Sequence, residues 1–310
     1  MASPDKSHRI LCIGMPVRDL VFHVRELPSR GGKVPAQSYE EIAGGNALNA
    51  AVAISRLGGR PMLSGPTGDF DDQSASYILN RLKDEGIDAI GLVPMHGLVT
   101  PMSSILIDPG GERTIVTFRD PELWKVRLPD ADILLRDCSA VLVESRCGSF
   151  ASSLCAEARR RDIPVIVDGD TMMPLHDGLL AAASHLVFSQ EALRATTGHD
   201  DEADGLRRIK GLTSAFVAVT TGAKGVTWLD GDEIGHVPSF AVHAVDTLGA
   251  GDVFHGAFTL AIAERQDIPT AMRFSAAAAA IKCTRFGGAF AAPQRAETTE
   301  FLRNHASAVS

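Results

Sequence analysis

Short apolar runs rich in Val and Ile alternate with amphipathic stretches along most of the chain. Such runs predict buried strands, and helical connections between them make neighbouring strands parallel. We therefore expect an α/β protein, a three-layer sandwich whose mostly parallel central sheet is flanked by helices. The expected strands are RILCIGM (9–15), AVLVES (140–145), PVIVDGD (164–170), HLVFS (185–189) and FVAVTT (216–221); the clearest helices are NALNAAVAISRLGG (46–59), SYILNRLKDEG (76–86) and SLCAEARRRD (153–162).

Two segments depart from this alternation, at residues 19–42 and 102–118. The second reads as a hairpin, with two alternating β runs joined by Asp-Pro-Gly-Gly, and the first also has strand character around a Gly-Gly turn. Strands inserted at two places without helices predict a small β-sheet lid beside the main domain. The lid should comprise 16–42 and 100–120, and the discontinuous main domain 1–15, 43–99 and 121–310.

Composition and charge exclude several classes of protein. The formal net charge of −8 works against general binding to nucleic acid or to an anionic membrane, because phosphate affinity needs clustered Lys and Arg. The five cysteines include no Cys-x-x-Cys pair, which disfavours a disulfide framework or a zinc site. The amino terminus has no signal-peptide pattern, and no apolar run approaches membrane-spanning length. We expect a cytoplasmic protein.

The stretch DTLGAGDVFHGAF (246–258) carries the clearest chemistry. Gly249, Ala250 and Gly251 open a predicted helix, whose backbone N–H groups and dipole suit an anion such as phosphate. Asp252 follows at once. As a base beside a phosphoryl-binding turn it would suit phosphoryl transfer to an alcohol. As a first-turn acid it would merely complement the helix dipole, and on its own we weigh the two readings about equally.

Two further segments are ambiguous by themselves. In AGGNALNAAVA, Asn46 and Asn49 could bind sugar hydroxyls from adjacent helical turns, or Asn46 could cap the helix while Asn49 faces solvent. In TTGAKG (220–225), the turn after an apolar strand could hold nucleotide phosphates or be a simple β-turn. No P-loop, dinucleotide fingerprint, G-x-S-x-G elbow or His-Glu-x-x-His motif is present.

These three segments, in this order and at these intervals, resemble the ribokinase-like sugar kinases, also called the phosphofructokinase-B family. The likeness covers essentially the whole chain, including the two-part lid. It implies ATP as phosphoryl donor and Mg²⁺ as cofactor, with Asp252 as catalytic base and Gly249, Ala250 and Gly251 as an anion hole. Sugar would be bound by Asp19 at the lid junction together with Gly45, Asn46, Asn49 and Glu144.

The resemblance also assigns the nucleotide site. Thr220, Gly222, Lys224 and Gly225 match the loop along the ATP phosphates, and AAAAAIKCTRFGG (276–288), which contains Lys282, matches the helix and loop beside adenine. Asp246 and the loop 285–288 fall where family members often hold a monovalent cation, so K⁺ is a further candidate. His255, one turn beyond Asp252, is expected to be a helix-face residue.

One motif departs from the family. The usual Asn-x-x-Glu, which organises Mg²⁺ and its waters, is replaced by Ser189, Gln190, Glu191 and Ala192. Because the β- and γ-phosphate charge still requires the ion, Asp168, Asp170 or Glu191 is expected to hold it through water.

The local sequence segments are most similar to those of sulfofructose kinases and less similar to those of ketohexokinases. Lys33 and Arg146 match positions that read a sulfonate, although a surface Arg and a solvated Lys are equally good readings. Thr117 stands where an amide would be expected, and Arg119 could compensate or indicate another acidic sugar. We expect a sugar kinase acting on a primary hydroxyl of a ketose-like or acidic sugar, sulfofructose included.

Two rivals remain. A nucleoside kinase of the same family would need aromatic side chains for a base, and a catalytically idle sugar sensor would use the same pocket. We also expect a homodimer through the lid, which would cover sheet edges and an apolar face that includes Val21, His23, Ile105 and Ile107.

Overall fold

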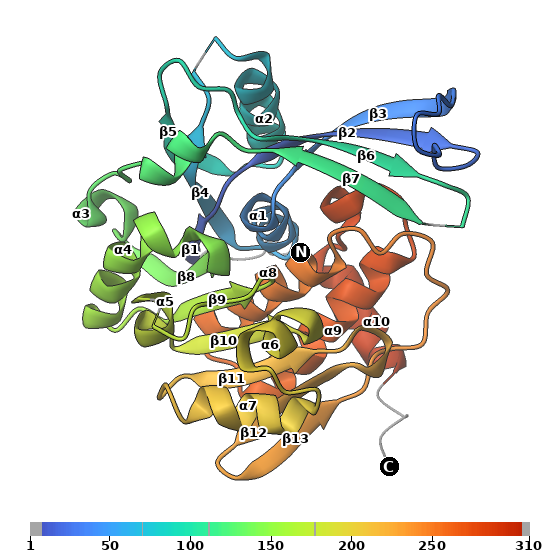
Figure 1. The fold of residues 1–310 in the computed structure, drawn as a ribbon. Coiled ribbons are helices and arrows are strands. Elements are labelled where there is room, and N and C mark those ends of the chain that lie inside the picture. The colour runs from blue at the N-terminus through green and yellow to red at the C-terminus, as the bar shows by residue number, and fades with distance from the viewer. Residues whose placement is uncertain (1–7, 70, 111, 177, 306–310) are drawn as a thin grey trace.

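A computed structural model describes residues 8–69, 71–110, 112–176 and 178–305. It contains a nine-stranded main sheet and a separate four-stranded sheet (Figure 1). The order of the main sheet is β13-β12-β11-β10-β9-β8-β1-β4-β5. Strands from β11 to β5 in this order are parallel, while β12 and β13 add an antiparallel edge. The expected mostly parallel sheet is confirmed.

Every strand expected for the main sheet is present, with ends shifted by no more than two residues. Two strands that the pattern did not single out, β4 and β5, form the other edge. β4 contains Pro61 and Pro66, which break the usual strand signal because proline cannot donate to a ladder. The strands are β1 (Arg9–Ile13), β4 (Arg60–Thr67), β5 (Asp88–Pro94), β8 (Cys138–Glu144), β9 (Val165–Gly169), β10 (His185–Ser189), β11 (Phe216–Thr220), β12 (Val226–Asp230) and β13 (Glu233–Val237).

Helices cover both faces of this sheet, which makes three layers (Figure 1). Alternate strand residues point to opposite sides: Ile10 and Cys12 pack with α1, α8 and α9, whereas Leu11 and Ile13 pack with α4, α6 and α7. No described helix is both long and apolar enough to cross a membrane. The helices are α1 (Asn46–Arg56), α2 (Gln73–Asp84), α3 (Ala131–Leu134), α4 (Gly148–Arg160), α5 (Gly178–Ala182), α6 (Gln190–Thr197), α7 (Glu202–Lys210), α8 (Ala250–Ala263), α9 (Ile268–Cys283) and α10 (Arg295–Asn304).

The second sheet is the expected lid. It has the order β3-β2-β6-β7 and consists of β2 (Val17–Val24), β3 (Ala36–Gly44), β6 (Met102–Ile107) and β7 (Arg113–Phe118). Only β2 and β6 are parallel, because the chain passes through α1, β4, α2 and β5 between them. In Figure 1 the lid projects from the main domain above the end of the sheet where α8 begins.

The apolar lid face that a second chain was expected to cover is partly buried within this chain, and pairing of two chains stays a prediction. Val21 lies opposite Ile105, so both point to one face, but their side chains are 1% and 3% exposed. That face also lines a cavity with residues 244–248 and 286–288 of the same chain. Ile115, which pairs with Ile105 on this face, is 51% exposed. On the opposite face Tyr39, Val116 and Phe118 are 50%, 69% and 49% exposed.

Candidate active site

The expected site residues gather at one edge of the main sheet. Parallel strands end together, so Glu144 at the end of β8, Asp168 near the end of β9 and Thr220 at the end of β11 lie at the same edge. The amino termini of α1 and α8 reach this edge too, and these helices pack directly on each other. In α/β sheets this is where ligands bind.

The amino terminus of α8 is open as an anion site. Gly249 is its N-cap with a φ of 76°, a left-handed conformation that favours glycine, and no side chain caps the helix. Within the described part of the chain the N-cap residue thus supplies no side-chain acceptor, and the Ala250 N–H donates to the Thr247 oxygen at 3.2 Å. A helix amino terminus without a side-chain cap suits phosphate. A Cβ added at Gly251 would meet no atom within 4 Å, so open space adjoins this turn.

Asp252 stands beside that space, half-buried on the first turn of α8. Asn49 on α1 donates from Nδ2 to Asp252 Oδ2 at 2.7 Å, which fixes the carboxylate. The pKa of Asp252 is raised to about 8, chiefly by burial and then by the charge of Asp168, while the Asn49 hydrogen bond and His255 oppose the rise. A carboxyl group with this pKa is mostly protonated at neutral pH and becomes an ionised base as the pH approaches 8.

Close packing of α1 on α8 makes this pairing possible. A Cβ at Gly256 would come within 2.5 Å of the Ala50 backbone oxygen, so only glycine allows the helices to approach this closely. Gly45, with a φ of 100°, allows the turn from β3 into α1 close to the Met15 backbone oxygen. The approach of α1 to α8 at Gly256 brings Asn49 within hydrogen-bond distance of Asp252.

Asp168 and His255 form a buried pair beneath Asp252. Both are nearly inaccessible, and His255 Nε2 lies 3.4 Å from Asp168 Oδ1. His255 Nδ1 is 2.8 Å from the Gly251 oxygen and Nε2 is 3.1 Å from the Val187 oxygen. Since carbonyl oxygens only accept, these contacts favour a proton on each ring nitrogen, which is the cationic form of the ring. Burial opposes this charge, but Asp168 and the two carbonyl oxygens raise the pKa of His255 overall.

His255 is therefore part of the site, although we expected a helix-face residue. Sequence offered one signal, because His255 lies three positions after Asp252 and thus on a neighbouring part of the same helix surface. Which surface is buried could not be seen, since nearly all of α8 is apolar.

Asn46 and Glu144 stabilise the start of α1 differently from what was expected. Asn46 does not cap the helix; its Nδ2 donates to Asp168 Oδ2 at 3.2 Å. Glu144 accepts from the Ala47 backbone N–H at 3.0 Å and so serves as the cap from a neighbouring strand. Burial raises the pKa of Glu144 to about 7. Both residues lie at the site, and contact with sugar hydroxyls stays a prediction.

Two arginines converge on the sugar side of the site. Arg146, after β8, is paired with Asp170 and lies 3.6 Å from Glu144. Arg119 follows β7 of the lid, and burial and the nearby charge of Arg146 lower its pKa. Among the described residues neither Nε atom has a hydrogen-bond partner, but Arg146 Nε forms an ion pair with Glu144 Oε2 at 3.6 Å. Both guanidinium groups are half-buried and bring positive charge to this part of the site.

Asp19 brings the lid into the same region. It lies on β2 next to Gly44, where an added Cβ would meet the Asp19 carboxylate at 2.2 Å. Burial raises the pKa of Asp19 to about 6, although Ser103 and Arg119 oppose the rise. The lid junction thus adds an acid and, through Arg119, a cation to the site.

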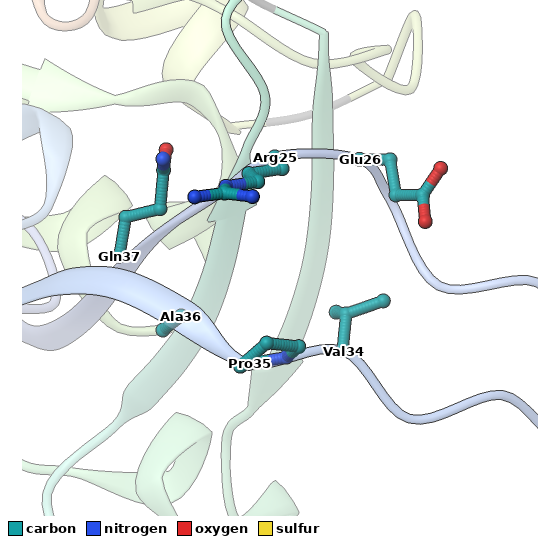
Figure 2. A pocket seen from close by; sticks show the side chains of 6 residues that line it. All are labelled: Arg25, Glu26, Val34, Pro35, Ala36 and Gln37. Atoms are coloured by element: carbon teal, nitrogen blue, oxygen red, sulfur yellow. The ribbon is translucent and has the colours of Figure 1, made fainter.

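Lys33 lies elsewhere. It is exposed in the segment between β2 and β3, beyond Val24, and so at the other end of β2 from Asp19. At about 3.3 Å per residue, the five steps from Asp19 to Val24 alone span roughly 17 Å. A hollow of about 380 Å³ lies at this lid tip, shown in Figure 2, but it contains none of the expected catalytic residues. Its lining is Arg25, Glu26, Val34, Pro35, Ala36 and Gln37.

The loop expected to follow the ATP phosphates comes directly after β11, at the end of the sheet where Glu144 and Asp168 also lie. Gly222 and Lys224 are exposed in a short turn after β11, and Gly225 has a φ of 108°. Lys282 does not join them. Its side chain is fully buried at the end of α9 and its Nζ contacts Asp246, so the expectation that it faces the nucleotide is wrong.

The carboxylates expected to organise Mg²⁺ differ in how far they are exposed to solvent. Asp168 is buried and already bonded to Asn46 and His255, so it presents no open face to a hydrated ion. Asp170 and Glu191 are exposed. Ser189, in place of the family's Asn, caps α6 by accepting from the Ala192 N–H at 3.2 Å. Among the described residues no three His, Cys, Asp or Glu side chains converge as a metal site.

Comparison with known proteins agrees with this geometry. The model of the pfkB family carbohydrate kinases matches residues 7–295. Ribokinase from Bacillus subtilis (strain 168) is 28% identical over 295 residues, 94% of this chain and 99% of that one, and fructokinase from Solanum tuberosum is 27% identical over 288 residues, 87% and 89%. A provisionally assigned ribokinase structure from Agrobacterium tumefaciens is 39% identical with a TM-score of 0.90, covering 96% of this chain and 98% of that one.

Proposed function

The chain belongs to the pfkB family of carbohydrate kinases, phosphotransferases that act on sugar hydroxyls, and from this we propose its reaction. The chain transfers the γ-phosphoryl group of ATP to a primary hydroxyl of a furanose-like ketose or of an acidic sugar, sulfofructose among the candidates. The observation that carries the proposal is the Asp252 carboxylate, fixed by Asn49 beside the open amino terminus of α8.

Each group of site residues has a separate role in the proposed reaction. Asp252 accepts the proton of the sugar hydroxyl as its oxygen attacks the γ-phosphorus, and the bond from that phosphorus to the β–γ bridging oxygen breaks to release ADP. The N–H groups around Gly249–Gly251 stabilise the negative charge on the moving phosphoryl group. Asp19 and the lid hold the sugar and exclude water, which would otherwise hydrolyse ATP.

Magnesium would supply positive charge to the β- and γ-phosphates when bound. Asp170 and Glu191 are the exposed acids that could hold its waters. The exposed turn of Gly222 and Lys224 is placed to follow the nucleotide phosphates.

An anionic group on the sugar is favoured by Arg119 and Arg146. Both guanidinium groups are half-buried, and the charge of Arg146 lowers the pKa of Arg119, so a sulfonate, carboxylate or phosphate beside them would offset this repulsion. Asp170 and Glu144 hold Arg146 in place, with Glu144 Oε2 at 3.6 Å from its Nε. A neutral ketose would supply no counter-charge to Arg119, so acidic sugars should be the better substrates.

Alanine at Arg119 or Arg146 is expected to lower kcat/KM for an anionic sugar by about tenfold or more, because each guanidinium makes a charge-assisted bond worth about 1.5–3 kcal/mol. The kcat/KM for fructose should change much less, because fructose has no anionic group for the arginine to bind. The ratio of kcat/KM for sulfofructose over fructose measures the effect within one variant. Arg208→Ala, on the exposed side of α7, is the control. An unchanged ratio in both variants would remove the anionic-sugar assignment.

A substrate panel tests the function itself. ATP consumption is measured with ribose, fructose, sulfofructose, sugar acids and nucleosides, each at saturating Mg²⁺. Turnover confined to sugars supports the proposal, and turnover confined to nucleosides supports the nucleoside-kinase rival. Sugar binding without turnover on any substrate would identify a sensor.

The pH profile should report Asp252. Its pKa of about 8 means that the ionised base is a minority below this value, so kcat/KM for the sugar should rise about tenfold per pH unit and level off above about pH 8 to 9. Asn49→Ala removes a hydrogen bond that stabilises the carboxylate, so it should move the profile to higher pH. A flat profile between pH 7 and 9 would contradict the role of Asp252 as base.

Pairing of two chains through the lid is also proposed. It would use the outer face of the sheet, where Tyr39, Val116 and Phe118 are exposed, because Val21 and Ile105 on the inner face are buried within the chain.

A further inference from the structure

Lys282 is a fully buried lysine next to the anion hole. Its side chain is 0% exposed at the end of α9. The ammonium donates to the backbone oxygen of Asp246 at 2.7 Å and lies 3.0 Å from Asp246 Oδ2. Burying a lysine charge is costly unless it is paired and hydrogen-bonded, as it is here. A buried lysine of this kind is expected to have a specific role. Its partner, Asp246, begins the segment that leads into α8.

Asp246 connects Lys282 to that segment. Its Oδ1 accepts from the Leu248 N–H at 2.8 Å, and its Oδ2 accepts from the Gly288 N–H at 3.1 Å. Gly249, the N-cap of α8, follows directly. The neighbouring backbone is tied to α9 as well, because the Val245 N–H donates to the Cys283 oxygen at 2.8 Å. The position of the turn at 246–249 therefore depends on Asp246 and its partners.

These residues do not fit the K⁺ ion that the family likeness suggested. K⁺ would be bound by carbonyl and carboxylate oxygens, and the Asp246 backbone oxygen and Oδ2 are the oxygens that Lys282 contacts. A second cation on the same oxygens would stand a few ångströms from the ammonium and be repelled in a half-buried site. The ammonium thus already occupies the place of a monovalent cation.

We propose that Lys282 is a built-in cation that replaces an activating K⁺ ion and positions the anion hole through Asp246. It touches neither substrate, so it is a positioning residue. The electrostatics of Asp246 agree: although burial opposes the change, the Leu248 N–H, Lys282 and the Gly288 N–H together lower the pKa of its carboxyl group. The expected effect on activity rests on the proposed kinase function, whereas the expected effect on ADP binding does not.

The first test is cation dependence of the unaltered chain. Initial rates and nucleotide affinity, the latter by calorimetry with ADP, are measured in K⁺, Na⁺ and tetramethylammonium salts at equal ionic strength. Values within about twofold of each other are expected, because a change smaller than about 0.4 kcal/mol indicates no specific ion. Stimulation by K⁺ of about tenfold or more would overturn the proposal.

The second test removes the ammonium. Lys282→Ala should weaken ADP binding and lower kcat by about tenfold or more, and K⁺ or ammonium ion should restore both by entering the space left behind. Lys282→Met keeps the length but admits no ion, so it should be impaired without rescue. Its thermal midpoint should not respond to K⁺, whereas that of Lys282→Ala should rise. Lys83→Ala, near the end of α2, is the control.

The outcomes separate this proposal from the proposed function. If no sugar is phosphorylated but ADP binding and the thermal midpoint of Lys282→Ala recover specifically with K⁺, the built-in cation stands and the kinase assignment fails. If sugars are phosphorylated and Lys282→Ala binds ADP as tightly as the unaltered chain in tetramethylammonium, the kinase stands and the role of Lys282 is refuted.

Discussion

Asparagine in place of Asp252 is expected to lower kcat by about 10³-fold or more, near the upper end of what a general base contributes. The amide has nearly the same shape and can still contact Asn49, so ground-state binding of sugar and ATP should change little. A loss in kcat without a loss in affinity identifies an interaction made in the transition state. Steady-state kinetics with a coupled ADP assay, and sugar binding by calorimetry, measure the two parts.

The same substitution has an expected effect on stability that rules out unfolding as the cause. The raised pKa of Asp252 means that the fold favours its protonated form, so stability is lost as pH rises through about 8. Asp252→Asn should therefore melt higher than the unaltered chain at pH 8.5, and the gap should shrink at pH 5, where Asp252 is protonated in the folded chain. A variant that retains most of its kcat would contradict the base assignment.

Sequence indicates Asp252 and its glycine turn as candidates because their order along the chain is itself the motif, and their roles in the reaction stay a prediction. Their partners in space could not be predicted in the same way. The pairing of Asn49 with Asp252 joins residues 203 positions apart. It depends on the contact of α1 with α8, which Gly256 permits but does not by itself indicate.

Lys282 illustrates why the rest could not be predicted. In AAAAAIKCTRFGG a lysine at the end of an alanine-rich helix suggests a charge that reaches solvent or a nucleotide phosphate. Its burial follows from the segment 244–248, which packs over the end of α9 and supplies the Asp246 oxygens. Nothing in the local pattern states that a distant loop will provide a counter-charge.

The lid shows the same limit. Alternation along β2 correctly predicted that Val21 and His23 share a face, and register with β6 adds Ile105. How much of each face is buried depends on the position of the whole sheet relative to the main domain, and segments 244–248 and 286–288 lie across a cavity from the inner face. Periodicity specifies two faces of a strand but not the partner of each.

Valine at Gly251 is the second change with a large expected effect, a fall in kcat of about 10²–10³-fold, as when a donor to developing charge is lost. Gly251 has an exposed backbone with open space beside it and no positive φ, so the structure gives no internal reason for glycine here. The reason would be the phosphoryl group, which must approach the N–H closely. A branched side chain would keep it away.

Stability separates this effect from damage to the helix. Valine has a better helix propensity than glycine by a few tenths of a kcal/mol, so Gly251→Val should melt no lower than the unaltered chain. Gly249→Ala is the contrasting control: its φ is 76° and its Cβ would lie 3.1 Å from the Ala289 nitrogen, so it should cost roughly 1 kcal/mol or more of stability. Gly251→Ala should fall between the unaltered chain and Gly251→Val in kcat. If both Gly251 variants turn over sugar normally, the phosphoryl group does not pass the amino terminus of α8, and Asp252 would need another partner for its reaction.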